Sequence, residues 1–186
     1  MNKPRGLVTT ASDERGRDTV YSLIAKENLP WIAPVGRLDK ASEGLLLMTN
    51  DSEWADQIAA PQCHLDKTYH VQIDRVATPD LIERIEHGVR RGSETLRVKQ
   101  ARLLRAGKKN SWLEVVLDEG RNRQIRKIME SQGIEVLRLL RVAIGPLQLG
   151  ELAKGSFHML THEEKLTLDA AMRRSSFEKP PRPASR

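Results

Sequence analysis

With 186 residues, the chain is long enough to bury one sizeable core and short for two independent domains. Lys and Arg outnumber Asp and Glu by 31 to 25 and the pI is about 9.7, which suits a polyanionic partner but also occurs in proteins with merely solvated basic faces. One cysteine excludes an internal disulfide. The sequence shows neither a secretion signal nor the roughly 18 to 20 apolar residues of a membrane span, so we expect a cytoplasmic protein without membrane association.

The first third of the chain alternates short apolar segments with polar turns. We predict a strand at residues 5–10, a helix at about 18–27 and a strand at 31–35. After a polar loop, residues 44–49 are apolar on both faces, as in a fully buried strand. Asn50 or Asp51 can cap a helix at about 52–59.

The remaining segments continue this mixture of strands and helices. Alternation over residues 67–73 places Tyr69, Val71 and Ile73 on one side of a strand. Thr78 and Pro79 begin a helix that Gly88 ends. Strands near 95–104 and 111–118, a helix between residues 120 and 133, a strand at 135–144 and a capped helix from 161 to about 172 follow. The pattern predicts a mixed α and β domain over residues 1–172.

Basic residues are concentrated in two places. Between residues 121 and 141 they far outnumber the acids, which indicates a surface that could contact phosphates; they are Arg121, Arg123, Arg126, Lys127, Arg138 and Arg141. Residues 173–186 are rich in Ser, Pro and basic side chains, and we expect a flexible tail there. The tail either adds nonspecific RNA affinity or has no role.

The polar loop at residues 36–43 carries one carboxylate, Asp39, between two apolar segments. Strands on both sides can fix such a side chain at the mouth of a cleft. Taken alone, an Arg-x-Asp sequence in a loop is typical of a turn or a surface ion pair. Cys63, His64 and His70 match no standard zinc spacing and lack a fourth ligand, so we expect no metal site.

A resemblance to a known family favours chemistry at this loop. Gly-Arg-Leu-Asp at 36–39, followed by Ser-x-Gly-Leu-Leu-Leu-Met-Thr-Asn-Asp at 42–51, resembles the catalytic motif of the pseudouridine synthases of ribosomal RNA, the family of the small-subunit synthase A and its large-subunit relatives. Further segments resemble that family's motifs in the same order, and together they span nearly all of residues 1–160; they are 2–6, 67–71, 119–127, 138–141 and 144–146.

The resemblance implies an α+β fold with a mixed, mainly antiparallel central sheet and flanking helices. It implies that the protein isomerises one uridine of ribosomal RNA, with large-subunit RNA favoured over small-subunit RNA as the substrate. It implies no cofactor. Ser42 stands where many members have Thr, which keeps the hydroxyl. No RNA-binding domain of the S4 type precedes the first motif, as in a large-subunit branch of the family; a start assigned too far downstream would look the same.

The resemblance also implies roles for individual residues. Asp39 is the catalytic carboxylate, and Arg126 is the cation expected beside it, unless it is an ordinary surface arginine. Tyr69 is expected to pack against the flipped uracil, whereas its periodicity alone favours the core. Arg37 is expected to enter the space that the uridine vacates or to contact a phosphate.

Lys67, Arg121 and Arg123 are candidate phosphate contacts or, equally, solvated charges. The expected partner is ribosomal RNA or a pre-ribosomal particle, bound by a monomer. The alternative function is a noncatalytic RNA-binding or ribosome-assembly protein on the same fold, for which Asp39 would be dispensable. A nucleoside hydrolase would need a second acid or a metal cluster beside Asp39, and the sequence offers neither.

Overall fold

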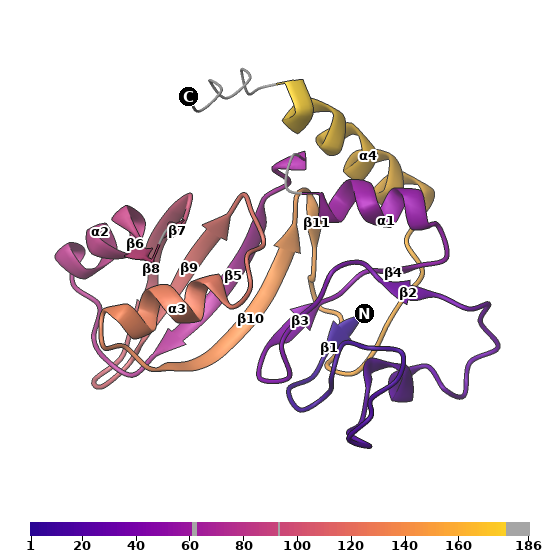
Figure 1. Cartoon of the computed structure of the whole chain (residues 1–186), viewed down its shortest axis with the longest axis horizontal. Helices are drawn as coiled ribbons and strands as arrows, with labels where there is room; N and C mark the ends of the chain where they lie inside the picture. Colours follow the sequence, from indigo (N-terminus) through magenta and orange to yellow (C-terminus); the bar gives the residue numbers. More distant parts are fainter. Residues whose placement is uncertain (61–62, 93, 178–186) are drawn as a thin grey trace.

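The fold is built on a central sheet, described here from a computed structural model that covers residues 1–60, 63–92 and 94–177 (Figure 1). The strands follow the order β1 (Asn2–Lys3), β3 (Glu43–Leu45), β10 (Val136–Ile144), β5 (Lys67–Ile73), β9 (Ser111–Leu117) and β8 (Gln100–Ala106), with β11 (Leu147–Gln148) paired to β10. The β3–β10 pairing is parallel, and the other pairings described in this sheet are antiparallel. The expected α+β fold with a mixed, mainly antiparallel sheet is therefore confirmed.

One face of the long strands carries the main core. In β9, Leu113, Val115 and Leu117 alternate with partly buried residues, and β5 turns Val71 and Ile73 to the same face. Helices α2 (Pro79–His87) and α3 (Gln124–Ser131) cover that face and bury their apolar stripes against it (Figure 1). Burial of each such side chain stabilises the fold by roughly 1.5 to 3 kcal/mol.

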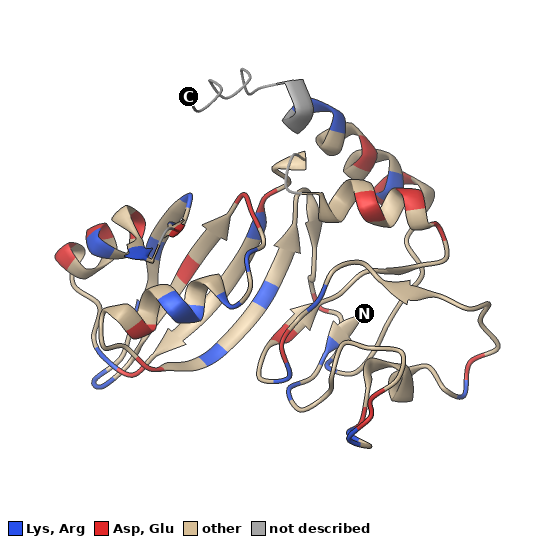
Figure 2. Ribbon diagram, in the orientation of Figure 1, with Lys and Arg blue, Asp and Glu red and all other residues tan. Residues whose placement is uncertain are grey.

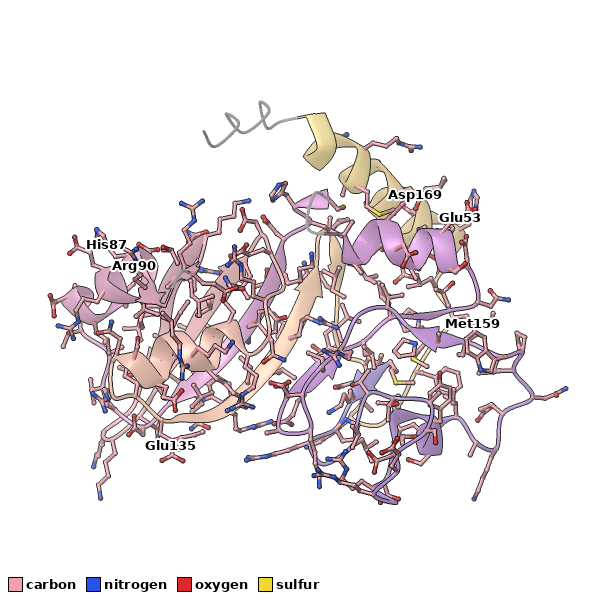
Figure 3. The ribbon with its side chains drawn as sticks, in the orientation of Figure 1. Glu53, His87, Arg90, Glu135, Met159 and Asp169 are labelled. Atoms are coloured by element: carbon pink, nitrogen blue, oxygen red, sulfur yellow. The ribbon has the colours of Figure 1, made fainter. Side chains whose placement is uncertain are left out.

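The other half of the molecule holds two smaller cores. Helix α1 (Ser52–Ala59) packs beside α4 (His162–Phe177), and Figure 3 labels Glu53 on the first helix and Asp169 on the second. The Trp54 indole donates to the Asp169 carboxylate at 2.7 Å. The second core surrounds Leu38, Leu46 and the 3-10 helix Val20–Leu23. Two small two-stranded sheets complete the described strands: β2 (Ala33–Pro34) with β4 (Met48–Thr49), and β6 (Val89–Arg91) with β7 (Glu94–Leu96).

Several predicted elements are confirmed at their ends, where local hydrogen bonds fix them. Asp51 caps α1 through the Trp54 amide, and Thr78 caps α2, which ends at Gly88. The Thr161 hydroxyl and the Glu164 carboxylate each accept from the other residue's amide, so the predicted capping box opens α4. The predicted strands at 67–73, 111–118 and 135–144 correspond to β5, β9 and β10.

Other predicted elements are wrong, and long-range pairing explains most of the differences. The strand expected at 5–10 is a loop, because the Gly6 amide donates to Lys40 and Val8 bridges Thr19, so the segment has no single partner strand. The helix expected at 18–27 is reduced to one 3-10 turn. The apolar run at 44–49 divides between β3, which pairs with β1 and β10, and β4, which pairs with β2.

Three boundaries in the second half also differ. The strand expected at 95–104 is split into β7 and β8, and the helix expected from residue 120 begins at Gln124. Helix α4 continues to Phe177, so the predicted boundary between domain and tail at 172/173 falls inside it; Leu168 and Met172 anchor the helix to α1. Residues 178–186 of the expected tail lie outside the described residues. No helix in the described part of the chain is both long and apolar enough to span a bilayer.

Candidate active site

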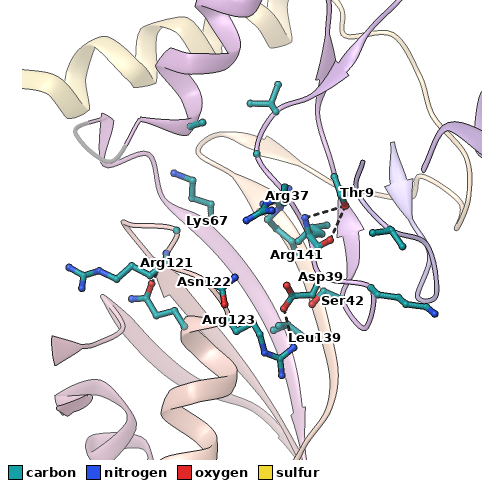
Figure 4. Close-up of a pocket in the computed structure, with 18 of the residues that line it drawn as sticks. Thr9, Arg37, Asp39, Ser42, Lys67, Arg121, Asn122, Arg123, Leu139 and Arg141 are labelled. Carbon is teal, nitrogen blue, oxygen red and sulfur yellow. Dashed lines mark hydrogen bonds and ion pairs between the residues drawn. The ribbon is translucent and has the colours of Figure 1, made fainter. Parts of the chain in front are cut away.

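A cleft of about 760 Å³ opens beside β5 and β10, within the range of roughly 300 to 1,000 Å³ that is usual for ligand sites. Its walls come from residues 8–17, from the loop between β2 and β3, and from the turn before α3. All the predicted site residues except Arg126 line it, and Figure 4 shows most of them around one opening; they are Arg37, Asp39, Lys67, Tyr69, Arg121 and Arg123. Segments far apart in the sequence therefore meet where the resemblance predicted a site.

Asp39 presents a carboxylate that is 34% exposed, on a loop whose backbone is tightly held. Each carbonyl from Leu38 to Ser42 accepts a hydrogen bond from a distant segment. The donors are Thr9 Oγ1 to Leu38 at 2.8 Å, Lys3 Nζ to Asp39 at 3.1 Å and to Ser42 at 2.8 Å, the Gly6 amide to Lys40 at 2.8 Å, and Arg126 Nη2 to Ala41 at 3.2 Å. Such bonds remove freedom from the loop and fix the direction of the carboxylate.

The ion-pair partner of Asp39 is Arg123, whose Nη1 lies 3.5 Å from Oδ2 (Figure 4). In this structure Arg123, and not the expected Arg126, forms this ion pair. Arg126 instead donates to the carbonyls of Ala41 and Val136, at 3.2 and 3.3 Å, and so ties the loop to β10. Burial and the neighbouring Arg123 charge lower the pKa of Arg126, whereas the charge of Asp39 raises it.

The position of Arg123 follows from the late start of α3. Arg123 immediately precedes the helix with φ 52° and ψ 32°, a left-handed conformation that costs a residue other than glycine about 1 to 3 kcal/mol. Gln124 holds the turn, because its amide oxygen accepts from the Arg121 amide at 3.1 Å and its nitrogen donates to the Arg97 carbonyl at 2.7 Å. This conformation turns the Arg123 side chain back toward Asp39.

Tyr69 lies both against the core and at the cleft. It shares the strand face of Val71 and Ile73, which are fully buried, but it is itself only partly buried and lines the cleft. It packs against the core under α2 and α3 and also against the core around Leu46. The ring therefore lies where the two halves of the molecule meet and has one side available to a ligand.

The predicted phosphate contacts differ in their surroundings. Burial lowers the pKa of Lys67, so this amine sits in a less watery site than an ordinary surface lysine. Arg121 is already paired with Glu119 at 3.0 Å and Glu94 at 3.8 Å. Arg37 is exposed at the cleft. In Figure 2, further Lys and Arg positions are blue on the ribbon of α3 and along β10.

Sequence reasoning missed two residues that hold the Asp39 loop. Lys3 is fully buried beneath it, and burial lowers the pKa of Lys3 to about 8, against the opposing charges of Asp39 and Glu43. The motif at residues 2–6 is the only sequence signal for Lys3, and it gives the lysine no role. Thr9 carried no signal, because nothing in its neighbourhood distinguishes it from the adjacent Thr10.

Potential metal ligands are not clustered in the part of the chain that the structure describes, where no group of three His, Cys, Asp or Glu side chains could hold an ion. The thiol of Cys63 is free and buried.

Comparisons with known proteins show the family of this chain. The family model for RNA pseudouridylate synthase matches residues 1–131. Ribosomal large subunit pseudouridine synthase B of Bacillus subtilis (strain 168) is 38% identical over 169 residues, covering 89% of this chain and 68% of the relative. The Pseudomonas aeruginosa protein of the same name is 36% identical, and the match covers 88% of this chain and 43% of that relative. A crystal structure of a pseudouridylate synthase superposes with a TM-score of 0.78 at 29% identity, over 90% of this chain and 71% of that one.

Proposed function

Because this chain belongs to the RNA pseudouridylate synthase family, we propose that it isomerises one uridine of ribosomal RNA to pseudouridine in the cleft that holds Asp39. The observation that carries the proposal is the Asp39 carboxylate itself, which faces this cleft beside Arg123 and Tyr69 on an immobilised loop. The names of the Bacillus and Pseudomonas relatives support large-subunit RNA as the substrate.

The reaction breaks the bond between ribose C1′ and uracil N1, turns the base and joins C1′ to C5. N1 gains a proton and C5 loses one, so no oxidant or other co-reactant is consumed. A carboxylate suits the first step, as in glycoside cleavage, where carboxylates act on oxocarbenium-like carbon. We assign that step to Asp39, by attack on C1′, by attack on the base or by removal of the C2′ proton.

Tyr69 and Arg123 complete the proposed catalytic group. The Tyr69 ring offers an apolar face for the uracil, and its hydroxyl can assist loss of the C5 proton. Arg123 supplies a positive charge 3.5 Å from the carboxylate. Arg126, for which the resemblance implies this role, holds the loop backbone at Ala41.

Binding requires that the uridine leave its stack, which costs a few kcal/mol. Arg37 stands exposed two residues before Asp39, where it can fill the space left in the RNA. Lys67, Arg121 and Arg123 can contact phosphates and position the RNA without reading its sequence. Basic residues outnumber acidic ones along the cleft, which favours a polyanion there.

We further propose that the chain falls within the family of the small-subunit synthase A, on its large-subunit branch, acts as a monomer in the cytoplasm, and takes ribosomal RNA or a pre-ribosomal particle as its substrate. The motif order in the sequence supports the first point, and the names of the relatives support the last.

The test is to incubate the purified chain with unmodified ribosomal RNA and to map pseudouridine chemically. Wild type and Asp80→Asn should modify one site, since Asp80 forms an exposed ion pair with Arg84 outside the cleft. Asp39→Asn should bind RNA and form no pseudouridine. Equal product from wild type and Asp39→Asn would refute the catalytic assignment. RNA binding without any product, even from wild type, would favour the noncatalytic alternative.

A further inference from the structure

We propose that Thr9 is a positioning residue for catalysis, which fixes the direction of the Asp39 carboxylate by binding the backbone of the preceding residue, Leu38. This inference rests on the proposed function of Asp39. Thr9 lies in the loop at residues 8–17 that forms one wall of the cleft, and it is 7% exposed.

The Thr9 hydroxyl forms hydrogen bonds with both the carbonyl and the amide of Leu38. Thr9 Oγ1 donates to the Leu38 carbonyl at 2.8 Å and accepts from the Leu38 amide at 3.4 Å, as the dashed lines in Figure 4 show. A hydroxyl has one proton and two lone pairs, so it can make both bonds at once. These contacts join residues 29 positions apart in the sequence.

Thr9 can act as a fixed point because the backbone of the residue before it, Val8, is anchored through both its amide and its carbonyl. The Gly6 amide donates to Lys40, and the Val8 amide donates to Asp18 while the Val8 carbonyl accepts from Val20. The segment therefore stays in place without help from the Thr9 side chain. Loss of the hydroxyl should release Leu38 while leaving the 8–17 loop where it is.

Leu38 transmits this restraint to Asp39. Its side chain is buried in the core around Val20 and Leu46, and rotation of the peptide at residue 38 is a freedom that this burial alone does not remove. The Thr9 hydroxyl removes that freedom. Displacement of a catalytic group by about 1 Å can cost about 100-fold in rate, which is why one hydrogen-bonded residue can matter to turnover.

The experiment compares three variants with wild type. Thr9→Val keeps the β-branched shape and removes the hydroxyl, and Thr9→Ser restores it. Ser111→Ala is the matched control, since the buried Ser111 hydroxyl also binds a backbone amide, that of Ala77 at 2.8 Å, at the end of β9 away from the cleft. The measurements are single-turnover pseudouridine formation, RNA affinity, urea unfolding and hydrogen exchange of the peptide covering residues 36–43.

Thr9→Val should lower the single-turnover rate about 10- to 100-fold, leave RNA affinity within twofold and speed exchange in residues 36–43. Thr9→Ser should recover most of the rate, and Ser111→Ala should keep the rate although it loses similar stability. A wild-type rate or unchanged exchange in Thr9→Val would overturn the proposal, and so would an equal rate loss in Ser111→Ala. If wild type forms no pseudouridine, the proposed function fails first and this inference falls with it.

Discussion

Removal of the Arg126 guanidinium should destabilise the fold more than removal of the Arg123 guanidinium, although Arg123 is the partner of Asp39. Arg126→Met keeps the apolar stem of the side chain and deletes the donors to Ala41 and Val136. Hydrogen bonds from charged groups contribute about 1.5 to 3 kcal/mol each. Because both bonds are long and Arg126 is only partly buried, we expect the lower limit for each, about 3 kcal/mol together.

The matched change, Arg123→Met, removes an ion pair between side chains that are 50% and 34% exposed. At 3.5 Å, two unit charges in water attract by about 1 kcal/mol, and measured exposed pairs contribute about 0.2 to 1 kcal/mol. We therefore expect Arg123→Met to cost less than about 1 kcal/mol. The left-handed backbone at this position is equally unfavourable for methionine and so does not enter the difference.

Urea unfolding followed by circular dichroism measures both costs. With a slope of about 2 kcal/mol per molar urea, Arg126→Met should lower the midpoint by about 1.5 M and Arg123→Met by less than about 0.5 M. A double-mutant cycle with Asp39→Asn should give the Arg123 pair a coupling below about 1 kcal/mol. Equal losses from the two arginines, or a larger loss from Arg123→Met, would refute the assignment of Arg126 to the loop backbone.

Three other outcomes follow from the same contacts. Burial lowers the pKa of Lys3 to about 8, so between pH 8 and about 10.4 Lys3 binds fewer protons in the folded than in the unfolded chain. The free energy of unfolding should therefore rise with pH by up to about 1.4 kcal/mol per pH unit. Urea titrations of Lys3→Met at a pH of about 8 and about 9.5 should lack that rise. Raising salt fourfold should weaken RNA affinity steeply in filter binding, and Lys67→Met should reduce the logarithmic slope by about 0.7 to 0.9; an affinity insensitive to salt would remove Lys67 from the RNA surface. Gly44→Ala should cost more than about 3 kcal/mol, and a thermal melt equal to wild type would contradict the close packing of β3 on β10.

The sequence predicted best what depends on neighbouring residues. Alternation identified β5 and the face of Tyr69, and capping side chains located the starts of α1, α2 and α4, because these signals act over a few positions. Residues 5–10 and 44–49 were misassigned because their conformation depends on partners tens of residues away.

The same limit applies to the candidate site. Motif resemblance brought Asp39, Tyr69 and the basic residues to one cleft correctly, but it could not distinguish Arg123 from Arg126, one helical turn apart. The distinction depends on where α3 begins and on a left-handed residue before it, neither of which has a sequence signature here. The contact of Thr9 with Leu38 is equally invisible, since it depends on how two loops meet.

The parallel pairing of β3 with β10 explains why a residue on α3 can act on the Asp39 loop at all. The Asp39 loop leads directly into β3, and β10 follows α3 in the chain. Because β3 and β10 are parallel, the start of β10 lies beside the Asp39 loop. Arg126 then reaches carbonyls on both. The approach requires glycine at position 44, which has φ +103° and where a Cβ would collide with the Arg141 carbonyl oxygen. The glycine of the Ser-x-Gly motif is therefore required for the close packing of β3 on β10, which brings the Asp39 loop within reach of Arg126. The chemistry of the site depends on Gly44 in this way without any contact between Gly44 and substrate.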